Sequence, residues 1–420
     1  MARRGPHPLR FAILILPYGM TYGFVSLTLQ VLAVRRGVDE ATMFAIVTST
    51  YVVHSLKFLW APLVDGTLTR RAWYLIANLL TGLGVIAAAS MPIGPDSLVP
   101  LTIVIWAAQV GMTLMGMSCE AFLALAVPTE EKGKASGWYN AAVYAGTGSG
   151  WLGLKLAAWL PEGWMVGLVY AAVMLPCALP LIGLDVPRAA EHAPKLGAAM
   201  RQLIRDLVGL ARSRTGLTGL IIALTPVGAG ALQNAFSSVP GRWGIAPPYE
   251  LDLFGLVLNA DDVIGLATGV FGNLLSAAGA LLGGMLADRV VRRLGYAATG
   301  FTMALCAIAM AILPREPWVF VVFSSVYNLL TGLALAFFTA WVLETIGHGA
   351  VVTKYTIFAS LANLAIFYTG EADAFALDRG GHTWGTTAML ATDAAFTLAG
   401  CTLLVAMFVA MRRRSTSPAA

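Results

Sequence analysis

The chain has 420 residues, of which 58 % are hydrophobic and 12 % are charged, about half the charged share of a typical soluble protein. Apolar runs of about 20 residues recur along it, and each can cross roughly 30 Å of hydrocarbon as a helix. Because backbone groups in lipid must satisfy one another, this composition excludes a soluble fold and predicts an all-α, polytopic membrane protein.

Twelve candidate transmembrane helices follow one another along the chain. They cover residues 11–33, 41–64, 72–92, 98–126, 135–160, 164–184, 216–238, 263–287, 296–313, 318–343, 353–370 and 385–411. If the N-terminus is inside, the inner segments hold 20 of the 27 Lys and Arg residues and the outer loops hold five. This asymmetry predicts that both termini are cytoplasmic. It also accounts for the net charge of +5 without a nucleic-acid partner.

In the first half, three ionisable residues lie within predicted helices. His54 and Lys57 are three residues apart and share a helix face. Lys57 lies roughly 12 Å from the helix end, where it either extends toward the cytoplasmic surface or faces the bundle interior. Glu120 is the leading candidate for a proton site, because an unpaired buried carboxylate takes up a proton rather than staying charged. A structural pair between Glu120 and Lys57 is the alternative.

An acid followed by a pair of arginines lies between hydrophobic helices once in each half of the chain, within residues 52–73 and 281–296. This repetition predicts a duplicated membrane bundle. The acids either act as latches of an inner gate or serve with the arginines only to fix the topology. The residues concerned are Asp65, Arg70, Arg71, Asp288, Arg292 and Arg293.

A long basic inner segment separates the two halves. From Lys195 to Arg212, apolar positions repeat at helical spacing, which predicts an amphipathic helix on the inner membrane surface. The predicted organisation is therefore an N-terminal six-helix bundle over 1–184, a cytoplasmic linker over 185–215 and a C-terminal six-helix bundle over 216–420.

Polar side chains within the predicted helices are candidates for contacts with a solute. Tyr18 and Tyr22 are four residues apart and share a face of the first helix, where they either line a cavity or lie at the membrane interface. The seventh helix contains the helix breakers Pro226, Gly228 and Gly230. The predicted substrate contacts are Tyr18, Tyr22, Gln109, Gln233, Asn234, Asn328 and Asn363.

Near the C-terminus, Glu371, Asp373 and Asp378 are predicted to form an acidic outer turn between the last two helices. Asp393 lies within the twelfth helix, where a carboxylate is costly unless it is protonated or paired. The four cysteines fall within predicted helices with no close pairing, which predicts buried thiols and no disulfide or metal site. No cofactor is expected.

Several stretches carry a family resemblance. GGMLADRVVRRLG (283–295) is similar to the loop motif of the major facilitator superfamily. LPYGMTYGFVSLTLQVLAVRRGVD (16–39), SLKFLWAPLVD (55–65) and VPTEEKGKASG (127–137) resemble the peptide/acetyl-coenzyme A transporter family of AmpG-like muropeptide permeases. The resemblance is broad over the first half of the chain and thinner over the second.

This resemblance implies the major facilitator fold of two pseudo-symmetric six-helix bundles, functioning as a monomer in the bacterial inner membrane. It also implies proton-driven uptake of a muropeptide-like solute by alternating access. In that setting we expect Glu120 to bind the coupling proton, with His54 and Lys57 modulating it. Because few charges surround Glu120, the solute is expected to be less ionic, and a siderophore or other metabolite permease of the same superfamily is an alternative.

Two other classes of protein fit this sequence less well. A sensor built on a transporter fold normally needs a soluble output domain, and no segment between the predicted helices exceeds about 30 residues. An intramembrane enzyme is disfavoured because no H-E-x-x-H or G-x-S-x-G motif occurs. We therefore predict a transporter, not an enzyme, whose partners are membrane lipids, protons and a small-molecule solute.

Overall fold

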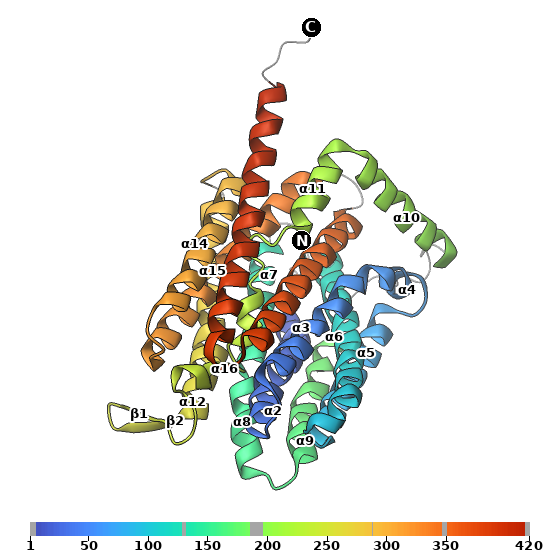
Figure 1. The fold of residues 1–420 in the computed structure, drawn as a ribbon. Coiled ribbons are helices and arrows are strands. Elements are labelled where there is room, and N and C mark those ends of the chain that lie inside the picture. Colours follow the sequence, from blue (N-terminus) through green and yellow to red (C-terminus); the bar gives the residue numbers. More distant parts are fainter. Residues whose placement is uncertain (1–5, 128–131, 185–195, 288, 347–350, 416–420) are drawn as a thin grey trace. The chain divides into compact units, whose positions relative to one another are not determined.

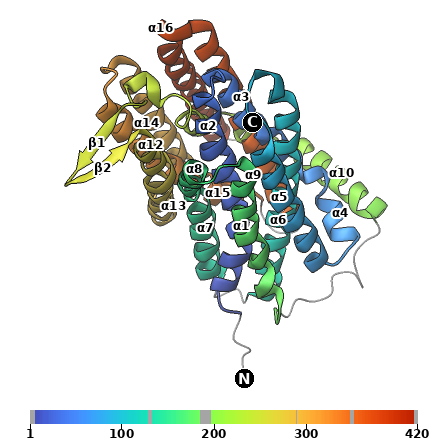
Figure 2. The same ribbon diagram turned by 90° about the horizontal axis from the view of Figure 1, so that it is seen from below.

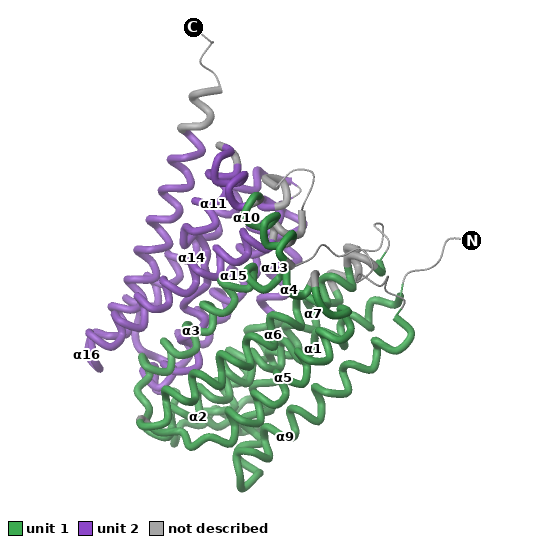
Figure 3. Tube along the Cα trace, turned by 90° about the vertical axis from the view of Figure 1, so that its right-hand side faces the viewer, with its two compact units in different colours: residues 1–205, 245–274 green, residues 206–244, 275–420 purple. Residues whose placement is uncertain are grey.

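The computed structural model describes a chain that is almost entirely helical (Figure 1). The described residues are 6–127, 132–184, 196–287, 289–346 and 351–415. Contacts divide the chain into two compact units, coloured separately in Figure 3. Unit 1 comprises residues 1–205 and 245–274, and unit 2 comprises residues 206–244 and 275–420.

Unit 1 contains the helices that correspond to the first six predicted spans. The first of these is continuous over Leu9–Arg35 and includes a π-helical stretch, η1. The helical elements of unit 1 are α1 (Leu9–Gly23), η1 (Phe24–Leu29), α2 (Gln30–Arg35), α3 (Glu40–Leu56), η2 (Lys57–Leu59), α4 (Ala61–Gly66), α5 (Arg70–Ser90), η3 (Pro95–Ser97), α6 (Leu98–Ala126), α7 (Lys132–Gly148), α8 (Gly150–Trp159), α9 (Gly163–Met174), η5 (Leu175–Leu181), α12 (Ala260–Ile264) and η9 (Gly265–Phe271).

The segment after the seventh predicted helix, predicted to lie outside, contains a small antiparallel hairpin in unit 1. β1 (Glu250–Leu253) pairs with β2 (Leu256–Asn259) through a two-residue turn. Both turn residues, Phe254 and Gly255, have positive φ, as a tight hairpin turn of this kind requires. The Asn259 side chain then accepts a hydrogen bond from the Asp262 backbone N–H and begins α12. In Figure 2 the hairpin projects beyond α12.

Two ion pairs connect α12 to other helices of unit 1. Arg35, at the end of α2, pairs with Asp261, and Lys155 of α8 pairs with Asp262. The Trp151 indole N–H also donates to Asp262 over 3.3 Å. Lys155 is therefore half-buried in a specific pair with an acid that lies more than 100 positions later in the chain.

Unit 2 contains α14 (Arg292–Ile312), α15 (Pro317–Ile346) and α16 (Val351–Ser415). The predicted seventh span is broken: α11 (Arg214–Leu224) is followed by two short turns, η7 (Ala231–Ala235) and η8 (Pro240–Trp243). The break lies at Gly228 and Gly230, which have φ of 61° and 71° that residues with a side chain rarely adopt. Two helices, α10 (Leu196–Arg212) and α13 (Gly272–Ala287), cross the boundaries between the units.

The prediction of an acidic outer turn over residues 371–378 is wrong. Glu371, Asp373 and Asp378 lie within α16, and the chain bends only at Gly381, where φ is 57° and ψ is −153°. The hydropathy minimum that suggested a loop is a stretch of helix in which Asp378 is exposed, Glu371 is half-buried and Asp373 is buried. The first arm of α16, residues 351–380, and the second arm, residues 382–415, meet at this bend.

In the described part of the chain, nine helices are long and apolar enough to cross a membrane, or ten if the bent pair Met200–Arg212 and Gly216–Leu224 forms one span. This confirms the all-α, membrane-spanning class, whereas the number of twelve spans stays a prediction. The fifth predicted span is divided at Ser149 into α7 and α8. The amphipathic helix of the inner segment is present as α10.

Candidate functional site

Lys57 lies at a break between two helices of unit 1. α3 ends at Leu56 and the chain tightens into the turn η2, Lys57–Leu59. Pro62, in the first turn of α4, explains this break, because a proline ring clashes with the carbonyl four residues earlier and prevents an unbroken α-helix. The Lys57 side chain is half-buried at this junction.

His54 joins α3 to α6 one turn before this break. It is buried, and its Nε2 atom lies 3.0 Å from Oε1 of Gln109, which is fully buried. With the amide oxygen as acceptor, Nε2 carries the hydrogen. The imidazole also packs edge-on against Tyr18 of α1, with ring centroids 6.2 Å apart, and against Tyr51 at 6.0 Å. The Tyr51 hydroxyl in turn lies 2.9 Å from that of Tyr22.

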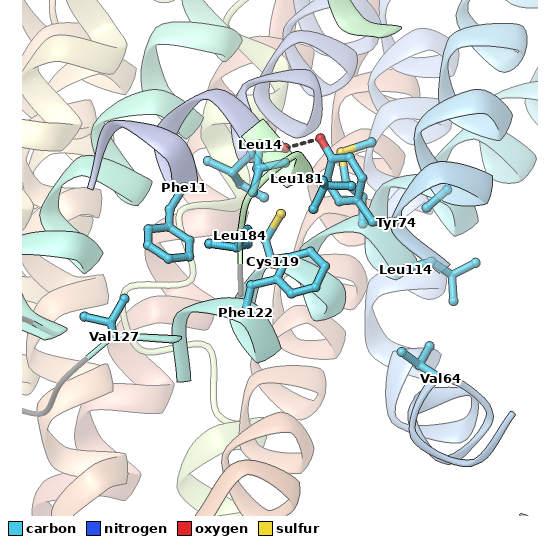
Figure 4. Close-up of a cluster of buried hydrophobic side chains, with 13 residues drawn as sticks. Phe11, Leu14, Val64, Tyr74, Leu114, Cys119, Phe122, Val127, Leu181 and Leu184 are labelled. Atoms are coloured by element: carbon cyan, nitrogen blue, oxygen red, sulfur yellow. Dashed lines mark hydrogen bonds between the residues drawn. The ribbon is translucent and has the colours of Figure 1, made fainter. Parts of the chain in front are cut away.

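Glu120 lies on the opposite side of α6 from the core of unit 1. Met115, Cys119 and Phe122 are fully buried in a cluster with α1, α4, α5 and η5 (Figure 4). One helical residue corresponds to about 100°, so burial of these three side chains turns Glu120 away from that core. The structure accordingly leaves Glu120 exposed on the surface of unit 1.

The same core fixes how α5 and α1 pack beside α6. Tyr74 of α5 is fully buried, and its hydroxyl donates to the carbonyl oxygen of Leu14 over 2.7 Å, the dashed line in Figure 4. This hydrogen bond satisfies the one polar atom that Tyr74 brings into an otherwise apolar cluster. The packing therefore holds the backbone of α1 and α6, and with it the positions of Tyr18 and Glu120.

Lys57 and Tyr18 are both within electrostatic range of Glu120. No ion pair within 4 Å joins Lys57 and Glu120 in the described part of the chain, so the predicted structural pair is not formed. We call this set the unit 1 polar cluster. It comprises Tyr18, Tyr22, Tyr51, His54, Lys57, Gln109 and Glu120.

Six of these seven residues are among the predicted site residues, and the structure brings them together. Tyr51 is the one that sequence reasoning missed. It lies three residues before His54, so the helical spacing that linked His54 with Lys57 also places Tyr51 on that face. Its contacts with Tyr22 and His54 connect α1 to α3.

In the first Asp–Arg hairpin, the structure describes contacts of an arginine with a backbone carbonyl. Arg71, near the start of α5, donates to the carbonyl oxygen of Leu184, and Arg10 donates to that of Gly183 over 3.0 Å. Cations near the C-terminal end of a helical segment are stabilised by its free carbonyls. Arg70 is the first residue of α5, and the Asp65 side chain lies outside the described residues.

The second hairpin is built in a similar way in unit 2. Arg292 is the first residue of α14 and donates to the carbonyl oxygens of Ala287 over 3.3 Å and Ala340 over 3.5 Å. Arg293 is half-buried, and Asp288 lies outside the described residues. A latch made by either acid therefore stays a prediction.

Two of the predicted substrate contacts in unit 2 bind each other. The Gln233 side-chain amide of η7 donates to Oδ1 of Asn328 on α15. Asn328 also donates to the Ser324 carbonyl oxygen over 2.8 Å. Asn234 is buried beside Gln233, whereas Asn363 is half-buried on the first arm of α16.

The four cysteines are buried and unpaired, as the sequence predicts. Among the described residues, no group of three or more His, Cys, Asp or Glu side chains could hold a metal ion.

The fold is similar to that of several transporters of known structure. A POT family transporter in complex with a thioalcohol-conjugated peptide is 12 % identical, with a TM-score of 0.71 over 95 % of each chain. A D-xylose–proton symporter is 15 % identical, with a TM-score of 0.69 over 94 % of this chain and 96 % of that one. The nucleoside transporter NupG is 13 % identical, with a TM-score of 0.71 over 96 % and 98 %.

At these identities the similarity concerns the fold alone. The sequence itself adds an independent match, because residues 11–370 fit the family model of the Major Facilitator Superfamily. That match covers most of the chain, including both Asp–Arg hairpins and all seven residues of the unit 1 polar cluster. The chain therefore belongs to the Major Facilitator Superfamily of membrane transporters.

Proposed function

We propose that this protein is a secondary active transporter that takes up a small to medium-sized polar solute together with protons, by alternating access. The single observation that carries this proposal is the environment of Glu120. It is an exposed acid on a long apolar helix, within electrostatic range of Lys57 and Tyr18. A charge in hydrocarbon is costly, so we expect this face of unit 1 to border water or polar groups when the acid is ionised.

In this proposal Glu120 takes up and releases the coupling proton. Lys57 modulates it, because a nearby cation favours the ionised carboxylate. His54 acts indirectly, since it is buried against Gln109 and contacts Tyr18 and Tyr51. The D-xylose symporter, whose fold this chain shares, is named as a proton symporter.

The solute that we propose is muropeptide-like and less ionic than a typical peptide. Polar side chains in each unit support this proposal. Unit 1 contains tyrosine hydroxyls and an imidazole. Unit 2 contains the side-chain amides of Gln233, Asn328 and Asn363. Such groups hydrogen-bond hydroxyl and amide groups of sugars and peptides. A siderophore or another polar metabolite has the same kind of groups and is the alternative solute.

We further propose that the protein functions as a monomer in the bacterial inner membrane, with both termini in the cytoplasm. The bias of Lys and Arg toward the predicted inner segments supports this orientation. The proposed six-helix bundles, 1–184 and 216–420, are supported by α5 and α14, which both begin at an arginine pair and are both 21 residues long. The linker is 185–215.

The proposal is tested by uptake into proteoliposomes that contain the purified full-length protein. A panel of radiolabelled muropeptides, siderophores and sugars is offered with and without an inward proton gradient. One pH unit stores about 1.4 kcal/mol per proton, which corresponds to about tenfold accumulation. We expect Glu120→Gln to lose this accumulation while it still binds the solute and equilibrates it.

Glu162→Gln provides the matched control, because Glu162 is an exposed acid of unit 1 at the start of α9, outside the polar cluster. It should accumulate solute as the unaltered protein does. Full proton-driven accumulation by Glu120→Gln would remove Glu120 from the mechanism. No transport of any member of the panel, with the gradient or without it, would contradict the proposed function itself.

A further inference from the structure

Two acids of unit 2 are buried on either side of the bend in α16. Asp373 lies on the first arm and is 0 % exposed, and Asp393 lies on the second arm and is 1 % exposed. The two arms are in close contact near the bend, since a Cβ atom at Gly385 would collide with the Leu377 carbonyl. The two carboxyl groups interact electrostatically across this contact.

Only one of the two acids has a described hydrogen-bond donor. The Tyr327 hydroxyl of α15 donates to Asp393, with distances of 3.1 Å to Oδ2 and 3.3 Å to Oδ1. Neither carboxyl oxygen of Asp373 has a hydrogen-bond partner among the described residues. An ionised carboxylate buried in this way would cost several kcal/mol.

The groups that surround the pair carry no compensating positive charge in the described part of the chain. Tyr327 of α15 and Cys306 of α14 are the titratable side chains that act on Asp393 from neighbouring helices. Phe236, directly after η7, packs against Tyr327 with ring centroids 5.6 Å apart. Asp393 and Tyr327 lie within electrostatic range of Asp373.

The nearby arginines of unit 2 bind other groups. Arg242 donates to the Gly381 carbonyl oxygen over 2.8 Å, at the bend itself. Arg315 donates to Oγ1 of Thr387 over 2.8 Å and lies over the Trp243 ring at 4.8 Å. Both guanidinium groups therefore bind the bend and its surroundings, and neither forms an ion pair with Asp373 or Asp393 in the described structure.

We propose that Asp373 and Asp393 form a proton-binding site in unit 2, in which at least one of the two buried carboxyl groups holds a proton. A proton is the ligand that fits, because two buried carboxylates close together cannot both ionise without a cation. Ca²⁺ and Mg²⁺ take six or more oxygen ligands, and the described surroundings add only the Tyr327 hydroxyl, which donates its hydrogen to Asp393. The site is separate from Glu120 and does not depend on which solute is carried.

The bound proton has a structural consequence. It allows the two arms of α16 to pack against each other and against Tyr327 without two buried negative charges. Loss of the proton would place two like charges at this contact, so the arms would separate or water would enter. Protonation of the pair thus sets the packing of α16 within unit 2.

The test is infrared difference spectroscopy of the full-length protein in lipid, recorded between acidic and alkaline pH. The C=O stretching band of a protonated carboxyl group reports the proton directly. We expect a band in the unaltered protein that is absent from Asp373→Asn/Asp393→Asn, while the band of Glu120 remains in both. Asp378→Asn serves as the matched control, because Asp378 is an exposed acid on the same arm of α16, and it should leave the band in place.

The single variant Asp393→Asn keeps the proposal testable if the double variant does not fold, because the amide oxygen can still accept from Tyr327. Asp373 then stays buried alone, so its band should persist at a shifted frequency. Identical spectra for the unaltered protein and for the folded variants would overturn the proposal. It would also be overturned if sodium chloride, in place of choline chloride, removed the band at constant pH, since that would identify a sodium site.

Discussion

Glu120 of unit 1 and the Asp373–Asp393 pair of unit 2 lie in contrasting surroundings. Glu120 is exposed and within electrostatic range of Lys57, whereas both aspartates are buried and the hydrogen-bond donor described for them is the neutral Tyr327. An exposed acid beside a cation can exchange protons with little rearrangement. A buried pair can do so only if its helices move apart or water enters.

If both proposals hold, the two units use protons for different purposes. In unit 1, proton exchange is compatible with a site that also meets a solute. In unit 2, protonation is tied to helix packing, because the acids lie on the two arms of one bent helix. In these proposals, a few acidic residues give the two units different responses to protons.

The largest effect on stability is expected from a change that disturbs the packing of α15, which carries Tyr327. A Cβ atom at Gly279 of α13 would collide with the Leu329 carbonyl of α15. We expect Gly279→Ala to destabilise the protein by about 1–3 kcal/mol, because helices at this distance cannot accept a methyl group without moving. The measurement is the thermal unfolding midpoint in detergent.

Gly284→Ala is the control for this experiment, since a Cβ atom there meets no other atom within 4 Å. We expect it to be neutral, or stabilising by up to about 1 kcal/mol, because alanine favours a helix over glycine. Equal midpoints for the two variants would show that the α13–α15 contact is not as close as the structure has it.

A second test removes the hydrogen bond from Tyr327 that Asp393 has and Asp373 lacks. Tyr327→Phe should cost about 1–3 kcal/mol, because a buried carboxyl group loses its described donor. The comparison variant is Tyr368→Phe, whose hydroxyl donates to the neutral Leu224 carbonyl over 2.5 Å, and a net loss of about 1 kcal/mol is expected there. A smaller loss of stability for Tyr327→Phe than for Tyr368→Phe would argue against a buried acid in unit 2 that depends on this hydrogen bond.

The smallest effect is expected in the unit 1 polar cluster, which is only partly buried. Tyr22→Phe and Tyr51→Phe each remove the hydrogen bond between their hydroxyls and should each cost about 0.5–1.5 kcal/mol. The double variant should lose less than the sum of the two, because the shared bond is lost only once. Strict additivity in thermal unfolding would mean that the two hydroxyls do not interact.

Much of the unit 1 site could be predicted from the sequence. An acid, a lysine and a histidine in apolar helices are costly, so their presence within predicted spans is itself the signal. Helical spacing placed His54 and Lys57 on one face, and Tyr51 follows from the same rule. Packing, by contrast, decided that Glu120 and Lys57 form no close ion pair, and that Gln109 is fully buried against His54.

The acids of unit 2 show where such reasoning failed. Glu371, Asp373 and Asp378 lower the hydropathy of their stretch enough to resemble a loop, but they lie within α16 and the chain turns only at Gly381. Asp373 is nevertheless 0 % exposed in the folded chain. A local stretch of sequence does not show which residues 20 or 50 positions away will pack against it in the folded chain.

The sequence by itself determined the class of this protein: apolar runs long enough to cross a membrane must be helical, and repeated arginine pairs mark the starts of α5 and α14. Tertiary structure alone decided which polar groups meet. The exposure of Glu120 and the burial of Asp373 and Asp393 depend on neighbouring helices. The physical reason is that hydrophobicity sets which segments enter the membrane, whereas contacts between helices set the surroundings of each charge.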